Sequence, residues 1–411
     1  MNDILFIILF TLFFIISFAY VWRKDSFYGG YYFFLYVYVI FFMVSYIYYP
    51  GFSKDIGGFF GYDIFYEFYF FISFSFGFFL FFLFLFDAIF HGKISGVKVN
   101  FALRLDRVSI PYIVFFGLYL CLYSYLLVTD YEKINYDSFS TGAFFTFGVT
   151  FKYLSSLLYV TYFLYKISNK KLYGFVFILA FSFWMLGAIK IGSRTDILSF
   201  FLGYTFLNIA LVRYGVVKRL PYIRYVLIAS ALVVLMLLIE KYRGSGIEEL
   251  SLERRILVKD YFAPAHILMA SIYHNLIDPM NVFLSNFFNL FFGLNYPYLQ
   301  TAPGNIMLDG SSSRSTGFAM YVFSEGYMFS GFLGFIYNGF FVALFLVFTR
   351  RVFWFKYVYL ECFWVGLVSM QIANLVRGQT MYFLKDFYII YLPMLFLLIV
   401  LSGLYKKRGP F

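Results

Sequence analysis

Long apolar stretches recur along this chain, and each is close to the length that a helix needs to cross a membrane. About 20 apolar residues span a hydrocarbon core about 30 Å thick. Of the 411 residues, 63% are hydrophobic and only 13% are charged, so polar side chains are too few to cover a water-soluble fold. The sequence therefore predicts an all-α polytopic membrane protein. We expect many of the 64 Phe and 41 Tyr side chains to face lipid.

Polar segments divide the apolar stretches into eleven expected transmembrane helices. These cover residues 3–22, 31–49, 64–88, 110–128, 142–165, 172–191, 197–212, 224–240, 326–349, 355–376 and 381–402. The chain then has three parts: eight helices in 1–240, one long loop in 241–316 and three helices in 317–411. Residues 281–292 of the loop are apolar but short, which predicts an interfacial or re-entrant helix.

The net charge of +11 indicates orientation rather than nucleic-acid binding, because cytoplasmic loops of membrane proteins collect Lys and Arg. Arg23 and Lys24 follow the first apolar stretch, which favours a signal anchor over a cleaved signal peptide. With the N-terminus outside, every inward-facing segment is basic, and the long loop falls outside. The inward-facing segments hold nineteen of the 32 basic residues: Arg23, Lys24, Lys93, Lys98, Arg104, Arg107, Lys166, Lys170, Lys171, Arg213, Lys218, Arg219, Arg224, Arg350, Arg351, Lys356, Lys406, Lys407 and Arg408.

Arginines on the outer side need a separate explanation. Arg194 lies in the turn 192–196, where Ser193 and Asp196 have the spacing of a capping box, so it should fall in the first turn of the seventh span. A helix N-terminus beside a guanidinium favours an anion. Arg377 ends the tenth span on the same side. Either arginine could instead be an interfacial anchor.

Three further candidates lie in the long loop. Arg254 falls on the apolar face of an amphipathic helix expected over 247–261, which favours burial against an acidic partner or a phosphate. Arg314 lies in the hydroxyl-rich segment 309–317, which suits sugar or phosphate contacts as well as an ordinary surface loop. His266 has the chemistry of a general base, although an ordinary loop histidine is an equally simple interpretation.

Glu325 is the acidic candidate. A continuous helix over the 25 residues from Glu325 to Arg350 is about 37 Å long, which places Glu325 at the outer rim of the ninth span. A carboxylate facing lipid is costly, so Glu325 should face a polar cavity or an arginine. The spans otherwise contain little charge, apart from Lys152 and Asp386.

Cysteine and histidine give no sign of a metal site or a disulfide. Cys121 and Cys362 lie inside apolar stretches, and His266 and His274 lack carboxylate or cysteine neighbours at ligand spacing, while the third histidine, His91, flanks a basic loop. We therefore expect neither a metal nor a cofactor.

The outer face lacks ATP, so a reaction there needs a donor that is already activated, such as a lipid-linked diphosphate. Arginines would neutralise its leaving group. Several features resemble the Wzy-type oligosaccharide repeat-unit polymerases of O-antigen synthesis. They are the long outer loop between late spans, the turn 192–196, the passage Ser324-Glu325-Gly326-Tyr327 with Gly331 and Gly334, and Val376-Arg377-Gly378.

The resemblance implies a glycosyltransferase of the bacterial inner membrane, with a periplasmic N-terminus and loop and a cytoplasmic C-terminus. It would transfer a growing glycan from undecaprenyl diphosphate to the non-reducing end of an undecaprenyl-diphosphate-linked repeat unit, without a metal, beside a flippase and a chain-length regulator. Glu325 or His266 would be the acceptor base. The implied diphosphate-binding arginines are Arg194, Arg377, Arg254 and Arg314.

Two other functions fit some of these features. A lipid-linked oligosaccharide flippase would line an internal cavity with charged residues, but the spans hold few of them and the long loop would have no role. An O-antigen ligase shares the donor chemistry and the large outer loop. The sequence alone separates a ligase from a polymerase only by family motifs.

Overall fold

The structure is a computed structural model of the chain. It describes residues 2–48, 65–91, 109–129, 143–168, 171–191, 194–218, 230, 234, 263–291, 321–351, 358–377 and 385–403. All regular structure within these ranges is helical, which confirms the all-α class. Five helices in the described ranges are long and apolar enough to cross a membrane: Ile4–Lys24, Ser26–Val44, Tyr66–Phe90, Lys171–Ala188 and Val322–Arg351. The chain is therefore an all-α membrane protein, while the count of eleven spans stays a prediction.

Helices occupy the first seven expected spans. They are α1 (Asn2–Lys24), α2 (Ser26–Tyr48), α4 (Phe65–His91), α5 (Ser109–Thr129), α6 (Ala143–Ser168), α7 (Lys171–Ile191) and α8 (Arg194–Arg213). The largest difference is the start of α2, which lies five residues before the expected position 31. Asp25 explains it, because its Oδ1 accepts a hydrogen bond from the backbone N–H of Phe27 at 2.9 Å and so caps the new helix. The eighth expected span, 224–240, lies outside the described helices.

The three late spans are each interrupted. The ninth consists of α14 (Val322–Ser330), the 3₁₀ turn η3 (Gly331–Leu333) and α15 (Gly334–Arg351). The tenth is split into α16 (Val358–Ser369) and α17 (Ile372–Arg377). The eleventh contains a π-helical turn, η4 (Phe387–Tyr391), followed by α19 (Leu392–Gly403).

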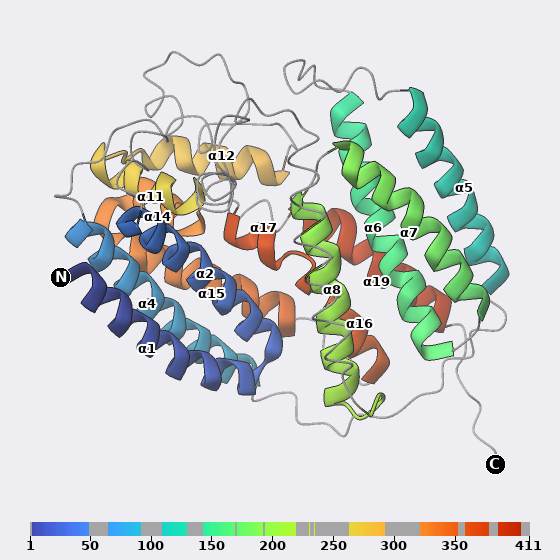
Figure 1. Cartoon of the computed structure of the whole chain (residues 1–411), viewed down its shortest axis with the longest axis horizontal. Coiled ribbons are helices and arrows are strands. Elements are labelled where there is room, and N and C mark those ends of the chain that lie inside the picture. The colour runs from blue at the N-terminus through green and yellow to red at the C-terminus, as the bar shows by residue number, and fades with distance from the viewer. Residues whose placement is uncertain are drawn as a thin grey trace. The chain divides into compact units, whose positions relative to one another are not determined.

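The chain folds into two compact units, and each takes segments from both halves of the sequence. Unit 1 comprises Met1–Gly96, Gly246–Trp354 and Gln371–Lys385. Within it, α1 packs on α2 and α4 packs along α15 (Figure 1). Helices α11 (Ala263–Tyr273), α12 (Pro279–Phe291) and α17 all contact α14, so α14 lies at the centre of the helix contacts considered below.

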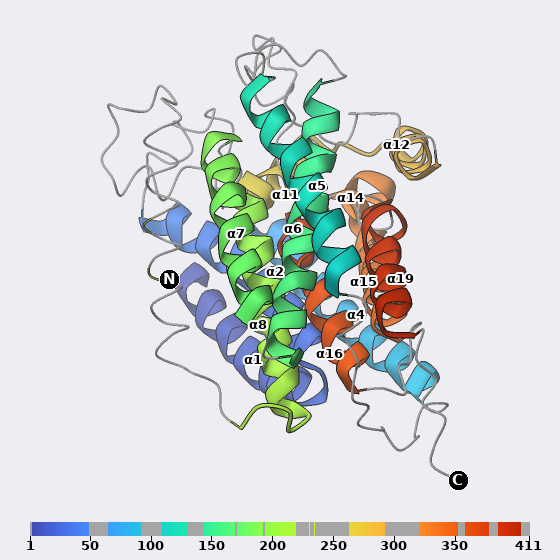
Figure 2. The same ribbon diagram turned by 90° about the vertical axis from the view of Figure 1, so that its right-hand side faces the viewer.

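Unit 2 comprises Val97–Ser245, Phe355–Met370 and Asp386–Phe411. Helices α5, α6 and α7 run side by side, as Figure 2 shows. Helix α8 packs closely on α16, where Gly203 and Gly366 face each other. A Cβ atom at Gly366 would come within 2.8 Å of the carbonyl oxygen of Gly203, so the crossing of α8 and α16 favours glycine, and the same Cβ atom would also meet the hydroxyl of Tyr159 from α6. That hydroxyl donates to the carbonyl of Phe363 at 2.9 Å.

Aromatic side chains fill the interior of unit 1, so the expectation that they face lipid is only partly right. Phe14 and Tyr36 stack with ring centroids 3.7 Å apart, and Tyr36 donates its buried hydroxyl to Thr11 at 2.8 Å. The outward face of α1 instead exposes aliphatic side chains such as Ile8 and Ile16. Aromatic rings thus supply much of the packing between α1 and α2, and the hydroxyls of Tyr32 and Tyr36 have partners on α1.

Candidate functional site

Glu325 is fully buried in unit 1, at 0% exposure, in the first turn of α14. Its Oε1 accepts two hydrogen bonds, one from Asn286 Nδ2 of α12 at 2.8 Å and one from the Tyr337 hydroxyl of α15 at 3.1 Å. Three helices therefore fix this carboxylate. The sequence drew attention to Glu325, but nothing in it pointed to Asn286 or Tyr337.

The continuous helix expected from Glu325 to Arg350 is wrong, because the helix breaks at Gly331, while the position of Glu325 at the outer rim of the membrane stays a prediction. Gly331 has φ +62° and ψ −137°, a conformation that other residues rarely adopt. The chain then folds back, so that Glu325 lies beside Tyr337, twelve residues further along. A site at this carboxylate would be inside the helix bundle of unit 1 rather than at the end of one long helix.

Asn338 and two glycines hold this hairpin together. The Asn338 side chain accepts from the backbone N–H of Gly326 at 3.0 Å and donates to the carbonyl of Phe323 at 2.7 Å. A Cβ atom at Gly334 would collide with the carbonyl of Gly326, and one at Gly326 would collide with Asn338. Small residues at both positions therefore let α14 and α15 approach closely enough to bring Tyr337 to Glu325.

Among the polar atoms of the described part of unit 1 that are buried without a hydrogen-bond partner are Asn286 Oδ1, Ser324 Oγ and Tyr31 Oη. Asn286 is hydrogen-bonded to Glu325, and Ser324 directly precedes Glu325 in the chain. The Tyr31 hydroxyl interacts electrostatically with Glu325. Buried polar atoms are nearly always satisfied in proteins, so this region has the capacity to bind a hydrogen-bonding group.

The helix that supplies Asn286 starts with a well-formed cap. Asp278 accepts from the backbone N–H of Asn281 at 3.1 Å and is followed by Pro279 at the first helical position. The helix, α12, exposes Met280 and Phe283 and buries Asn286. A short helix is thus present where residues 281–292 predict one, and its interfacial or re-entrant position stays a prediction.

The other expected site residues are placed only by their backbones or not at all. His266 lies in α11 and Arg377 ends α17, and both helices contact the helix of Glu325 in unit 1. Arg194 begins α8 in unit 2, as the capping-box spacing predicts. The side chains of these three residues lie outside the described part, as do Arg254 and Arg314 altogether.

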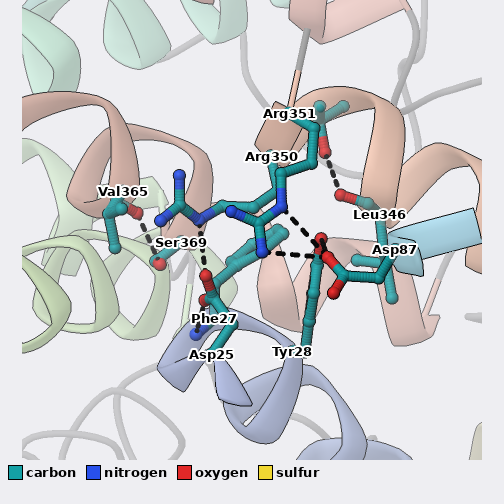
Figure 3. A network of polar contacts seen from close by, with 10 residues as sticks. Asp25, Phe27, Tyr28, Asp87, Leu346, Arg350, Arg351, Val365 and Ser369 are labelled. Carbon is teal, nitrogen blue, oxygen red and sulfur yellow. Dashed lines mark hydrogen bonds and ion pairs between the residues drawn. The ribbon is translucent and has the colours of Figure 1, made fainter. Parts of the chain in front are cut away.

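A network of ion pairs joins four helices at another place in unit 1, around the last residues of α15 (Figure 3). Arg350 Nε lies 2.8 Å from Asp25 Oδ2, and Arg351 Nη2 lies 2.9 Å from Asp87 Oδ1. Lys24 approaches the other oxygen of Asp87 at 3.1 Å. Sequence reasoning used these basic residues only to orient the chain and missed both aspartates.

In the described part of unit 2, two charged residues that the sequence singled out form an ion pair. Lys152 Nζ of α6 lies 2.9 Å from Asp386 Oδ2, directly before the π-helical turn. The two residues were the charged exceptions among the apolar spans. Their pairing shows why each can be accommodated there.

No group of three or more His, Cys, Asp and Glu side chains within the described ranges is arranged to hold a metal ion. Comparisons of this chain with protein families, with curated proteins and with solved structures give no match.

Proposed function

We propose that this membrane protein is an O-antigen or surface-polysaccharide polymerase of the Wzy type, acting on the periplasmic face of the bacterial inner membrane. The observation that carries the proposal is the buried Glu325. It is held by Asn286 and Tyr337 on a helix that contacts the helices of His266 and Arg377. A carboxylate whose helix contacts the helices of a candidate base, His266, and of a candidate anion-binding residue, Arg377, fits glycosyl transfer from a lipid diphosphate.

In the proposed reaction, a hydroxyl on the non-reducing end of the acceptor repeat unit attacks the anomeric carbon of the donor glycan. The new glycosidic C–O bond forms as the bond to undecaprenyl diphosphate breaks. The diphosphate leaves with the bonding electron pair, and the acceptor proton passes to Glu325 or His266. Arg377 would balance the negative charge that develops on the leaving group, and Arg194, Arg254 and Arg314 remain candidates from the sequence for the same role.

The geometry around Glu325 suits a positioned base. Two donors from different helices restrict the carboxylate to one orientation, as a positioned base requires. The polar atoms of Asn286 and Ser324 that lack partners would meet hydroxyl groups of a sugar. Supplying those partners is a reason for the acceptor to bind there.

A flippase is the second candidate, and one observation favours it. The Lys152–Asp386 ion pair lies among apolar helices, as charged residues of transporters often do. Loss of a flippase and loss of a polymerase have different effects on the lipopolysaccharide, so one assay separates the two functions.

The test is deletion of the gene in its host, followed by electrophoresis of the lipopolysaccharide. Loss of the polymerase leaves a single repeat unit attached to the core, so the ladder should collapse to one band. Loss of a flippase or of a ligase removes O-antigen altogether. Complementation with the intact gene should restore the ladder, and an unchanged ladder after deletion would refute the proposal.

A further inference from the structure

Helix α12 arranges its side chains in the opposite way to a helix on the surface of a water-soluble protein. Its outward face carries Met280 and Phe283, whose exposed fractions are 67% and 56%. Its inward face is more polar, because it buries Ser285 and Asn286 beside Val282. The helix contains no charged residue. Apolar side chains outside and polar side chains inside indicate that the surroundings of α12 are apolar.

The chain just before α12 is fixed to a candidate membrane span. The backbone N–H of Asp278 donates to the carbonyl of Met328 at 2.8 Å. A Cβ atom at Gly331 would be 2.9 Å from Ile277 Cδ1, so the exposed Ile277 side chain lies against this glycine. Met328 and Gly331 both belong to Val322–Arg351, which is long and apolar enough to cross a membrane. Helix α12 therefore begins directly beside this span.

The exposed apolar surface continues from this junction onto α4. Phe332, which follows Gly331, is exposed, and its ring lies 6.3 Å from that of Phe70 between centroids. Phe70 and Phe74 are exposed on α4, with ring centroids 4.3 Å apart. Helix α4 supplies the candidate span Tyr66–Phe90, so lipid is the expected cover of its exposed rings. The same lipid can extend over the outward face of α12.

The length of α15 agrees with this position. The helix has 18 residues, so it is about 27 Å long, and it ends at Arg350 and Arg351. If these arginines mark one edge of a hydrocarbon core about 30 Å thick, Gly334 lies near the opposite edge. The start of α12 is then close to that edge, where an amphipathic helix buries its apolar face about 5–10 Å deep.

We propose that the acyl chains of membrane lipids cover the outward face of α12, and that α12 forms a wall between the bilayer and Glu325. Asn286 on the inward face donates to Glu325, so the carboxylate lies directly behind this helix. A lipid tail against the outward face would be about one helix diameter, roughly 10 Å, from the Glu325 site. Lipid contact goes beyond the proposed polymerase activity and can be measured without any glycan.

A protein partner fits this surface less well. The outward stripe consists of Ile277, Met280, Phe283 and Phe287. A stable protein interface takes about 20–30 residues from each side. The α12 stripe is too small for that, whereas lipid chains need no minimum area.

Spin labels on α12 test the proposal in the purified full-length protein, reconstituted into vesicles of phosphatidylethanolamine and phosphatidylglycerol. M280C and F283C are labelled in a C121A background, since Cys121 is exposed and Cys362 is buried. Power saturation measures the accessibility of each label to oxygen, which concentrates in hydrocarbon, and to a water-soluble nickel chelate. The background protein without an added cysteine measures any labelling of Cys362.

Two further labels supply the references. F70C lies on the exposed face of α4, in a candidate membrane span, and K218C lies at an exposed charged position after α8. We expect the ratio of oxygen to nickel accessibility at M280C and F283C to rise above that of K218C to the level of F70C. Agreement between the two α12 positions guards against a local effect of either substitution.

Two outcomes overturn the proposal. A ratio at M280C and F283C equal to that of K218C would show that the outward face of α12 meets water. Low accessibility to both reagents would show that a protein surface, from this chain or a second copy, covers it. A normal lipopolysaccharide ladder after gene deletion would remove the polymerase proposal and leave the label measurements unaffected.

Discussion

Arg350 donates from its Nε to Asp25 Oδ2 across 2.8 Å, joining residues that are 325 positions apart in the chain. Both side chains are buried, and Asp25 also caps α2. The Asp25 carboxylate therefore caps α2 and also connects the junction of α1 and α2 to the last residues of α15.

The first prediction concerns this pair. D25L or R350M alone should destabilise the protein by about 3–5 kcal/mol, because each leaves a buried charge without its partner. The double variant D25L/R350M should recover most of that loss. Thermal unfolding of the purified protein measures it, with R213M at the exposed end of α8 as the control. A double variant as unstable as the singles would show that the pair does not act as a unit.

The second prediction concerns the break before α15. G331A should cost about 1–3 kcal/mol, because alanine does not tolerate the positive φ of this position. G334A should also destabilise, since its Cβ would collide with the Gly326 carbonyl. G77A is the control: Gly77 lies in α4 with no neighbour within 4 Å of an added Cβ, so alanine should stabilise by about 1 kcal/mol. Equal unfolding temperatures for all three would contradict the hairpin.

The helices at the first seven expected spans could be predicted because each is one continuous apolar helix, although their crossing of the membrane stays a prediction for some of them. The break at Gly331 could not be predicted, because glycines such as Gly331 and Gly334 are tolerated in apolar spans. Only the close contacts of these glycines show that the chain folds back between α14 and α15. Arg350 was recognised as basic, but its partner lies 325 residues away and no local pattern connects them. Glu325 was found because a carboxylate in an apolar stretch is rare, whereas Asn286 and Tyr337 are ordinary residues until the fold brings them together.

The third prediction separates the chemistry of Glu325 from its structural role. E325Q keeps an oxygen that accepts from Asn286 and Tyr337, so the protein should still accumulate in the membrane. It removes the base, so the lipopolysaccharide ladder should disappear if Glu325 takes the acceptor proton. Y337F removes one hydrogen bond, worth about 1 kcal/mol, and should weaken the ladder without abolishing it. A normal ladder with E325Q would assign the base to His266, which H266A tests in the same way.

The fourth prediction concerns Arg194 and Arg377, the two arginines expected on the outer side. Arg194 is the first residue of α8, where backbone N–H groups lack helical partners, and Arg377 is the last residue of α17. R194A and R377A should each abolish polymer while the amount of protein stays near that of the wild type. Immunoblotting and the lipopolysaccharide gel measure both quantities. R194K and R377K retain the charge but not the planar bidentate contact, so they should restore the ladder only partly.

The fifth prediction concerns orientation. Lys24, Asp87 and Arg351 lie near the C-terminal ends of α1, α4 and α15, and their contacts bring these three ends together. The three ends must therefore lie on the same side of the membrane, and the basic residues around them favour the cytoplasmic side. Reporter fusions at Lys170 and Asn281 should then report opposite sides, with Lys170 cytoplasmic and Asn281 periplasmic. Signals from the same side would exclude the alternation of spans, and with it the placement of Glu325, His266 and Arg377 on a face that receives lipid-linked glycans.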